Sequence, residues 1–161
     1  PRPLSITLAS HSPADTRRIG ARLARLLQPG DVLLLQGDLG AGKTCLTQGI
    51  GKGLRVKEVV KSSSFVLVNY YEGRLKVYHA DLFRLGAPEE VADLGLEENA
   101  RDGVLIVEWP EVAMQELPPE HLLVRFVADE PKDRGITLEA HGERYEELLR
   151  ELAPLVKAQQ A

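Results

Sequence analysis

A run of glycines and one lysine at residues 37–44 has the composition of a phosphate-binding turn. Its sequence, GDLGAGKT, matches the spacing G-x-x-x-x-G-K-[ST]. Glycines let the backbone curl until successive N–H groups point inward and form a nest for an anion. Lys43 supplies a point charge for the β- and γ-phosphates, and the Thr44 hydroxyl is a ligand for Mg²⁺. The turn predicts a nucleoside triphosphate site, and a glycine-rich turn with a solvated lysine is the alternative.

Two acidic residues end expected strands and are candidates for the metal site. Glu108 follows the apolar run at residues 104–107, and Asp81 ends the run at residues 77–81. Ligands of open α/β sheets bind at the carboxyl ends of the strands. Glu108 is therefore interpreted as the Walker B acid, with Glu in place of the usual Asp; a strand-terminal surface glutamate is the alternative. Asp81 is expected to hold a metal-bound water or to orient the attacking water.

Polar residues near these acids have supporting roles. His79 shares a strand face with Asp81 by the period-two rule, and we expect it to form a supporting hydrogen bond rather than to act directly. A hydroxyl within the serine run at residues 62–64 is a candidate sensor of the γ-phosphate, as in switch loops. A flexible polar loop is the alternative for this run.

The composition limits the class of protein. The chain has 161 residues, which favours one domain, and its 43% hydrophobic and 27% charged residues are ordinary for a globular protein. A net charge of −4 argues against a broad, unaided grip on nucleic acid. The single cysteine excludes an intrachain disulfide and suits a reducing compartment, and no apolar run approaches the roughly 20 residues of a membrane helix. We expect a cytoplasmic protein.

Hydrophobic spacing predicts the elements that position the candidate residues. Helices are expected at residues 13–27, 43–50, 88–93 and 143–157. Strands are expected at residues 4–8, 31–36, 65–71, 74–82, 104–107, 122–127 and 135–139. Gly51 and Gly53 are expected to end the second helix, and Glu72-Gly73 is a hairpin signal.

Strands and helices alternate, but the hairpins break a pure βαβ pattern, which favours a mixed sheet. We expect an α/β protein with a single P-loop ATPase domain over residues 1–161. The expected P-loop NTPase-like fold has a parallel core, antiparallel flanking strands and helices on both faces of the sheet.

Five segments in order resemble the TsaE family, also called YjeE: GDLGAGKT (37–44), SSSF (62–65), HADLFRL (79–85), DLGLEE (93–98) and VEWPE (107–111). The resemblance covers nearly the whole chain, and the histidine–aspartate strand combined with VEW is more specific than the P-loop alone. The family comprises bacterial P-loop ATPases required for the threonylcarbamoyl group on adenosine 37 of tRNAs that read ANN codons. The resemblance implies ATP and Mg²⁺ as cofactors, slow turnover alone, and docking on TsaD and TsaB that hydrolysis resets. Contact with tRNA is expected only through that complex, and no membrane is expected.

The resemblance also assigns residues. The implied catalytic residues are Lys43, Asp81 and Glu108, and the implied metal ligands are Thr44, Asp81 and Glu108. The implied nucleotide-binding residues are Asp38, Leu39, Gly40, Ala41, Gly42, Lys43, Thr44, Cys45, Ser64, Trp109 and Arg134. Lys132 competes with Arg134 for its role. The chain departs from the family's Ser-Pro-Thr-Phe at residues 62–65, and it has Phe83 where a tyrosine is usual.

Two other functions fit the P-loop. A small-molecule kinase would need an arginine-rich lid, but no arginine cluster follows the Walker B strand. A nucleotide-dependent binding module would turn over little even with partners. Several basic residues are candidates for docking or tRNA-facing patches, with a solvated surface as the alternative: Arg18, Arg22, Arg25, Lys52, Arg55, Lys57 and Lys61.

Overall fold

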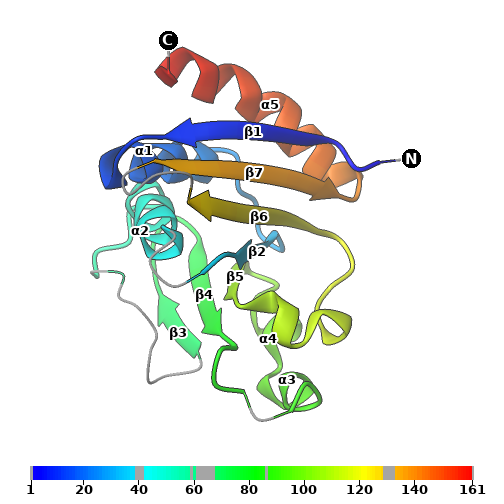
Figure 1. Ribbon diagram of the computed structural model, residues 1–161. Helices are drawn as coiled ribbons and strands as arrows, with labels where there is room; N and C mark the ends of the chain where they lie inside the picture. Colours follow the sequence, from blue (N-terminus) through cyan, green and yellow to red (C-terminus); the bar gives the residue numbers. More distant parts are fainter. Residues whose placement is uncertain are drawn as a thin grey trace.

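The computed structural model describes residues 2–38, 42–58, 60, 68–85, 87–128 and 133–160. The strands within these ranges are β1 (Ser5–Ser10), β2 (Val32–Gln36), β3 (Val68–Tyr71), β4 (Lys76–Asp81), β5 (Gly103–Glu108), β6 (His121–Ala128) and β7 (Arg134–His141). These described strands form one seven-stranded sheet in the order β1-β7-β6-β2-β5-β4-β3 (Figure 1). Strands β6, β2, β5 and β4 are parallel, whereas β1 with β7, β6 with β7, and β3 with β4 pair antiparallel. The expected parallel core with antiparallel flanks is confirmed.

Helices cover both faces of this sheet, as expected. Their bounds are α1 (Pro13–Ala24), α2 (Lys43–Gly53), α3 (Glu90–Leu94), α4 (Leu96–Asn99) and α5 (Glu143–Gln160). Alternate residues of β2 enter two separate hydrophobic clusters, because successive side chains of a strand point to opposite faces. Leu33 and Leu35 join the cluster that holds α1, α2 and α5, whereas Val32 and Leu34 join the one that holds α3 and α4. A strand buried on both faces explains the unbroken apolar run.

Helix α2 continues through Gly51 and ends at Gly53, the second of the two glycines that we expected to end it. Gly49 and Gly53 lie where α2 packs closely against α1. A Cβ at Gly49 would clash with the carbonyl oxygen of Arg17, and one at Gly53 would lie 2.5 Å from the Cβ of Ala24. The close approach fixes α2, which begins directly after Gly42, against α1.

The histidine that begins β6 makes stability depend on pH. The side chain of His121 is buried, its Nδ1–H donates to the carbonyl of Pro118 at 2.9 Å, and its ring lies 4.7 Å from that of His141. Burial lowers the pKa of His121, and the hydrogen bond to Pro118 and the carboxylate of Glu139 oppose this only in part. The folded state therefore keeps His121 neutral at pH values where the unfolded chain protonates it.

We expect the free energy of unfolding to be highest above pH 6.5 and to fall as the pH drops from there through the folded pKa of His121. The slope from this residue stays below about 1.4 kcal/mol per pH unit. Urea unfolding at pH 7.5 and 5.5 measures the effect. His121→Asn keeps a donor for Pro118 and should have a shallower pH dependence; an unchanged dependence would assign the effect to other groups.

Candidate functional site

The glycine-rich turn lies between a buried strand and a helix, which is the context that a phosphate-binding loop requires. It follows β2, and α2 begins at Lys43 directly after Gly42. Gly42 has φ = 109°, in the left-handed region that favours glycine. The candidate residues Leu39, Gly40 and Ala41 lie outside the described residues. The first-turn N–H groups of α2 have no partner within the helix, so this end suits an anion.

Lys43 is held in a buried position beside the turn. Its side chain is 4% exposed, Nζ donates to the carbonyl of Gly37 at 2.6 Å, and Nζ lies 3.9 Å from the ring centroid of Trp109. Burial lowers the pKa of Lys43, and the carboxylates of Glu108 and Asp81 oppose that shift. A cation that has already lost most of its water is well prepared to bind an anion.

Both candidate acids end neighbouring parallel strands. Asp81 of β4 and Glu108 of β5 are register partners, so the chain brings together two carboxylates that are far apart in sequence. Glu108 is 6% exposed, and its Oε2 lies 2.5 Å from Nε2 of the fully buried His79. The expected hydrogen bond of His79 is therefore confirmed. Oδ1 of Asp81 accepts from the N–H of Phe83 at 2.9 Å, which fixes this carboxylate at the strand end.

The donor set fits Mg²⁺ better than a metal held wholly by protein. Among the described residues, no three His, Cys, Asp or Glu side chains gather in a way that could hold an ion. Mg²⁺ in nucleotide sites takes one or two carboxylates, waters and phosphate oxygens. Glu108, Asp81 and the half-buried Thr44 at the start of α2 offer such a partial shell.

The indole of Trp109 contacts both the buried Lys43 and the exposed Phe83. Trp109 has φ = 58° and ψ = 48°, in the left-handed region, which is strained for a residue with a side chain. Its ring centroid lies 4.8 Å from that of Phe83, which is 49% exposed, and Lys43 contacts the same indole. The strained backbone directs the indole between the buried lysine and an exposed aromatic ring.

We expect the fluorescence of Trp109, the only tryptophan, to change when nucleotide binds. Phosphates compete for the ammonium of Lys43, so its contact with the indole must weaken. Titration with ADP and with a non-hydrolysable ATP analogue measures this, with Lys43→Ala as the unresponsive control. A wild-type signal that stays constant at saturating nucleotide would remove Trp109 from the site.

The other candidates lie at the same edge of the sheet or outside the described residues. Asp38 is exposed beside the turn, and Cys45 is half-buried in the first turn of α2, where its sulfur contacts Arg17 Nη1 at 3.9 Å. Arg134 begins β7 opposite Ala128 at the carboxyl end of β6, which runs parallel to β2. It is thus at the edge that carries the turn. The serine run at 62–64, including Ser64, and Lys132 are not among the described residues.

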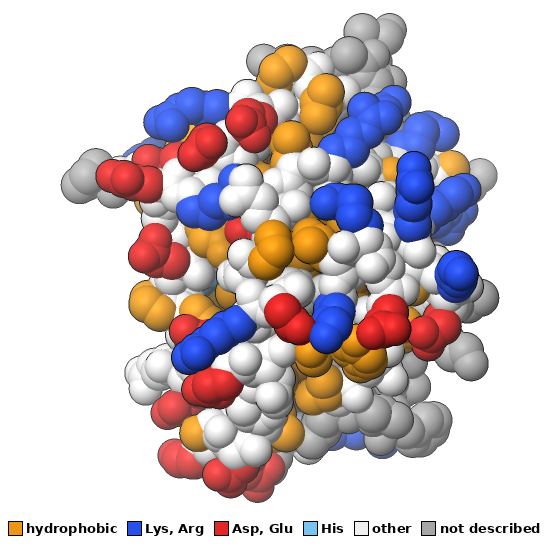
Figure 2. Space-filling model, turned by 180° about the vertical axis from the view of Figure 1, so that it is seen from behind, with side chains coloured by type: hydrophobic (Ala, Val, Ile, Leu, Met, Phe, Trp, Pro, Cys, Tyr) orange, Lys and Arg blue, Asp and Glu red, His pale blue; other side chains and the backbone are white. Residues whose placement is uncertain are grey.

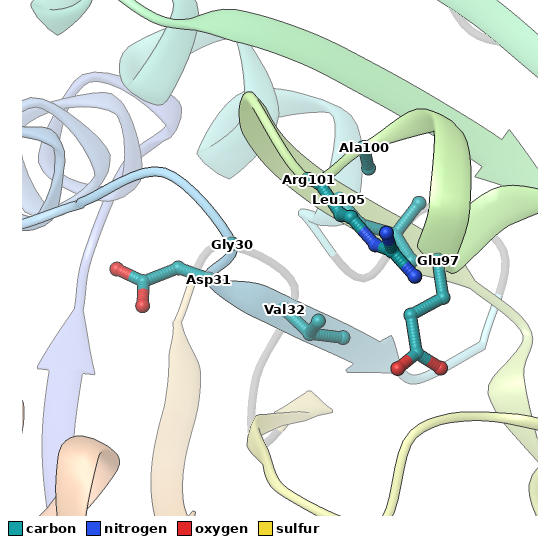
Figure 3. A pocket seen from close by; sticks show the side chains of 7 residues that line it. All are labelled: Gly30, Asp31, Val32, Glu97, Ala100, Arg101 and Leu105. Carbon is teal, nitrogen blue, oxygen red and sulfur yellow. The ribbon is translucent and has the colours of Figure 1, made fainter.

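Two cavities lie at the opposite edge of the sheet. One of about 130 Å³ is lined by Gly30, Asp31, Val32, Glu97, Ala100, Arg101 and Leu105 (Figure 3). The other has a volume of about 490 Å³ and shares Asp31 and its neighbours with the first. Arg144 donates to both carboxylate oxygens of Asp31, at 2.8 and 3.0 Å. This ion pair ties α5 to the start of β2. Both cavities are at the amino end of β2, so neither belongs to the candidate nucleotide site at its carboxyl end.

Many of the basic side chains lie on the side of the molecule that carries α1 and α2. Figure 2 shows Lys and Arg side chains concentrated on the right, the side where α1 and α2 lie when the molecule is seen from behind. Arg25, Lys52 and Arg55 are exposed, whereas Arg18 forms an ion pair with Asp15. Acidic side chains border the same region.

The comparison with known proteins decides the family. A family model described as "Threonylcarbamoyl adenosine biosynthesis protein TsaE" matches residues 10–136. The chain belongs to the TsaE family. This confirms the resemblance expected from its five sequence segments.

Two relatives that are named TsaE match this chain over most of their own length, in agreement with the family assignment. A protein of Bacillus subtilis (strain 168) named "tRNA threonylcarbamoyladenosine biosynthesis protein TsaE" is 40% identical over 144 residues, covering 88% of this chain and 90% of the relative. One of the same name from Treponema pallidum (strain Nichols) is 44% identical over 123 residues, covering 74% and 91%. The crystal structure of Bacillus subtilis YdiB superposes with a TM-score of 0.81 at 34% identity, covering 94% of this chain and 96% of that one.

Some contacts at this candidate site were not predicted from the sequence. Trp109 was expected beside the nucleotide, but its contacts with Lys43 and with the tilted ring of Phe83 were not expected. The only local signal was an aromatic residue in HADLFRL and another in VEWPE.

No helix in the described part of the chain is both long enough and apolar enough to cross a bilayer.

Proposed function

We propose that this TsaE protein binds and hydrolyses ATP with Mg²⁺, and that its nucleotide state controls docking on the TsaD–TsaB pair. The step served is formation of the threonylcarbamoyl group on adenosine 37 of tRNAs that read ANN codons, in the cytoplasm. The observation that carries the proposal is the burial of Lys43 beside the paired strand ends of Asp81 and Glu108. The names of the relatives supply the tRNA context.

Each residue has a proposed role. The turn from Asp38 to Thr44 binds the phosphates through backbone N–H groups, and Lys43 neutralises the β- and γ-phosphates. Thr44, Glu108 and Asp81 are the ligands offered to Mg²⁺. When bound, Mg²⁺ withdraws charge from the phosphate oxygens. Asp81, already fixed by the N–H of Phe83, orients the attacking water.

The remaining candidates contact the rest of the nucleotide. Cys45 lies at the helix start near the phosphates, Trp109 lies beside Lys43, and Arg134 reaches the nucleotide from β7. Ser64 is proposed to report the γ-phosphate. These roles account for nucleotide binding without a second substrate.

Hydrolysis is proposed to reset the partner complex. A P-loop protein without an acceptor converts the presence of the γ-phosphate into a change of loop shape that a partner reads. Turnover alone is slow, and TsaD and TsaB raise it. Since the net charge is −4, the chain reaches tRNA through the complex and does not bind it tightly alone.

The test measures association of the three proteins by light scattering with ATP, a non-hydrolysable analogue, ADP or no nucleotide. We expect association with ATP and the analogue, and dissociation as ATP is hydrolysed. Equal association under all four conditions would defeat the switch, although the ATP site could stand. Robust phosphate transfer to a small acceptor without partners would favour a kinase instead.

A further inference from the structure

A buried histidine holds one oxygen of the candidate metal ligand. His79 is fully buried in β4, and its Nε2 lies 2.5 Å from Oε2 of Glu108. The register pairs Asp81 with Glu108 and His79 with Ile106. His79 and Glu108 therefore meet on one face of the sheet, across an offset of two residues in the register.

The hydrogen bond to Glu108 indicates which ring nitrogen of His79 carries the hydrogen. A carboxylate can only accept, so the hydrogen of this bond is on Nε2 of His79. The other ring nitrogen, Nδ1, is buried and has no hydrogen-bond partner within the described part of the chain. An unsatisfied buried nitrogen lowers stability, so this pair is a poor way to stabilise a core. An apolar residue in place of His79, like Val77 and Ile106 on the same face, would stabilise the core more effectively.

We propose that His79 is a positioning residue: its Nε2–H holds Oε2 of Glu108 and leaves Oε1 as the oxygen that would be available to Mg²⁺. The inference rests on the proposed Mg²⁺–ATP function and adds a residue to it. Without this hydrogen bond, the flexible glutamate samples other rotamers, and most of them do not direct a carboxylate oxygen to the phosphate edge.

Two amide substitutions separate positioning from packing. The amide nitrogen of glutamine reaches about as far along the side chain as Nε2 of histidine, whereas that of asparagine reaches only as far as Nδ1. His79→Gln can restore the bond to Glu108, and His79→Asn cannot. Both variants remove the ring and place an amide in the same buried space, so each controls for the other.

The main measurement is the Mg²⁺ concentration that half-saturates binding of a non-hydrolysable ATP analogue, followed by calorimetry. We expect it to rise about 10-fold or more in His79→Asn, the range that loss of an outer-shell partner produces, and to stay within about 3-fold of wild type in His79→Gln. Binding of the analogue without Mg²⁺ should be equal in all three proteins. In the nucleotide-free wild type, ¹⁵N-histidine NMR should show the hydrogen on Nε2.

Equal Mg²⁺ dependence in both variants would overturn the proposal, and so would tighter Mg²⁺ binding in His79→Asn, since His79 would then compete with the metal. A bare Nε2 in the NMR spectrum would also overturn it, even if neither variant folds. Wild-type protein that binds no analogue with or without Mg²⁺ would instead refute the proposed function itself. Analogue binding that Mg²⁺ does not affect would refute only the metal role of Glu108 and His79.

Discussion

Lys43→Ala is expected to abolish ATP binding while the fold persists. The substitution removes the one buried ammonium described at the turn, and loss of a desolvated charge partner costs about 2–5 kcal/mol, or roughly 30-fold to several thousand-fold in Kd. The fold should tolerate it because the burial that lowers the pKa of Lys43 also makes its charge costly to the unliganded protein. Calorimetric titration with ATP and Mg²⁺ measures binding, and circular dichroism follows thermal unfolding.

Lys52→Ala is the matched control for this variant. Lys52 is on the same helix but exposed near its last turn, so its loss removes an equal charge far from the turn. ATP affinity in this control should stay close to wild type. Wild-type affinity in Lys43→Ala would sink the assignment of the turn, and a lost melting transition would show that Lys43 serves the fold.

Glu108→Gln and Asp81→Asn should reduce ATP hydrolysis far more than ATP binding. Both acids end adjacent strands beside Lys43, where they are proposed to serve the metal and the attacking water. We expect hydrolysis in the presence of partners to fall by about 100-fold or more, with nucleotide affinity within roughly 10-fold of wild type. Single-turnover phosphate release and calorimetry on the same preparations separate the two quantities.

Glu111→Gln controls for loss of negative charge near Lys43. Glu111 also acts on the ammonium of Lys43 but is exposed and follows the strand end by three residues. Its hydrolysis rate should stay near wild type. An acid whose amide variant hydrolyses ATP at the wild-type rate has been assigned the wrong role.

Strands and helices with strong periodicity were predictable from sequence. The apolar face of α5, with Tyr145 and Leu152 among its buried residues, and the antiparallel pair β6–β7 follow the expected spacing. The close packing of α2 on α1 was not predictable, because the role of Gly53 in it depends on Ala24 of another helix. The short helix α4 was also missed, since four residues carry too little periodicity to be recognised.

In the candidate site, too, some features were predictable from the sequence and others were not. The positions of Lys43 and Thr44 at a helix start and of Glu108 at a strand end were predictable, because each follows from a local sequence pattern. Contacts across the sheet were not, because they need the strand register. That Glu108 and Asp81 are direct register partners, and that His79 reaches Glu108, follow only from the alignment of β4 with β5.

The strand order has a consequence for synthesis of the chain. β2, which leads into the glycine-rich turn, lies between β5 and β6, and β1 pairs with β7, which ends at His141. Strands made early therefore wait for partners made late, and such non-local pairing slows folding. A nascent chain cannot complete its central sheet until most of it has left the ribosome. Amino-terminal fragments that contain the whole GDLGAGKT turn should consequently have no working nucleotide site.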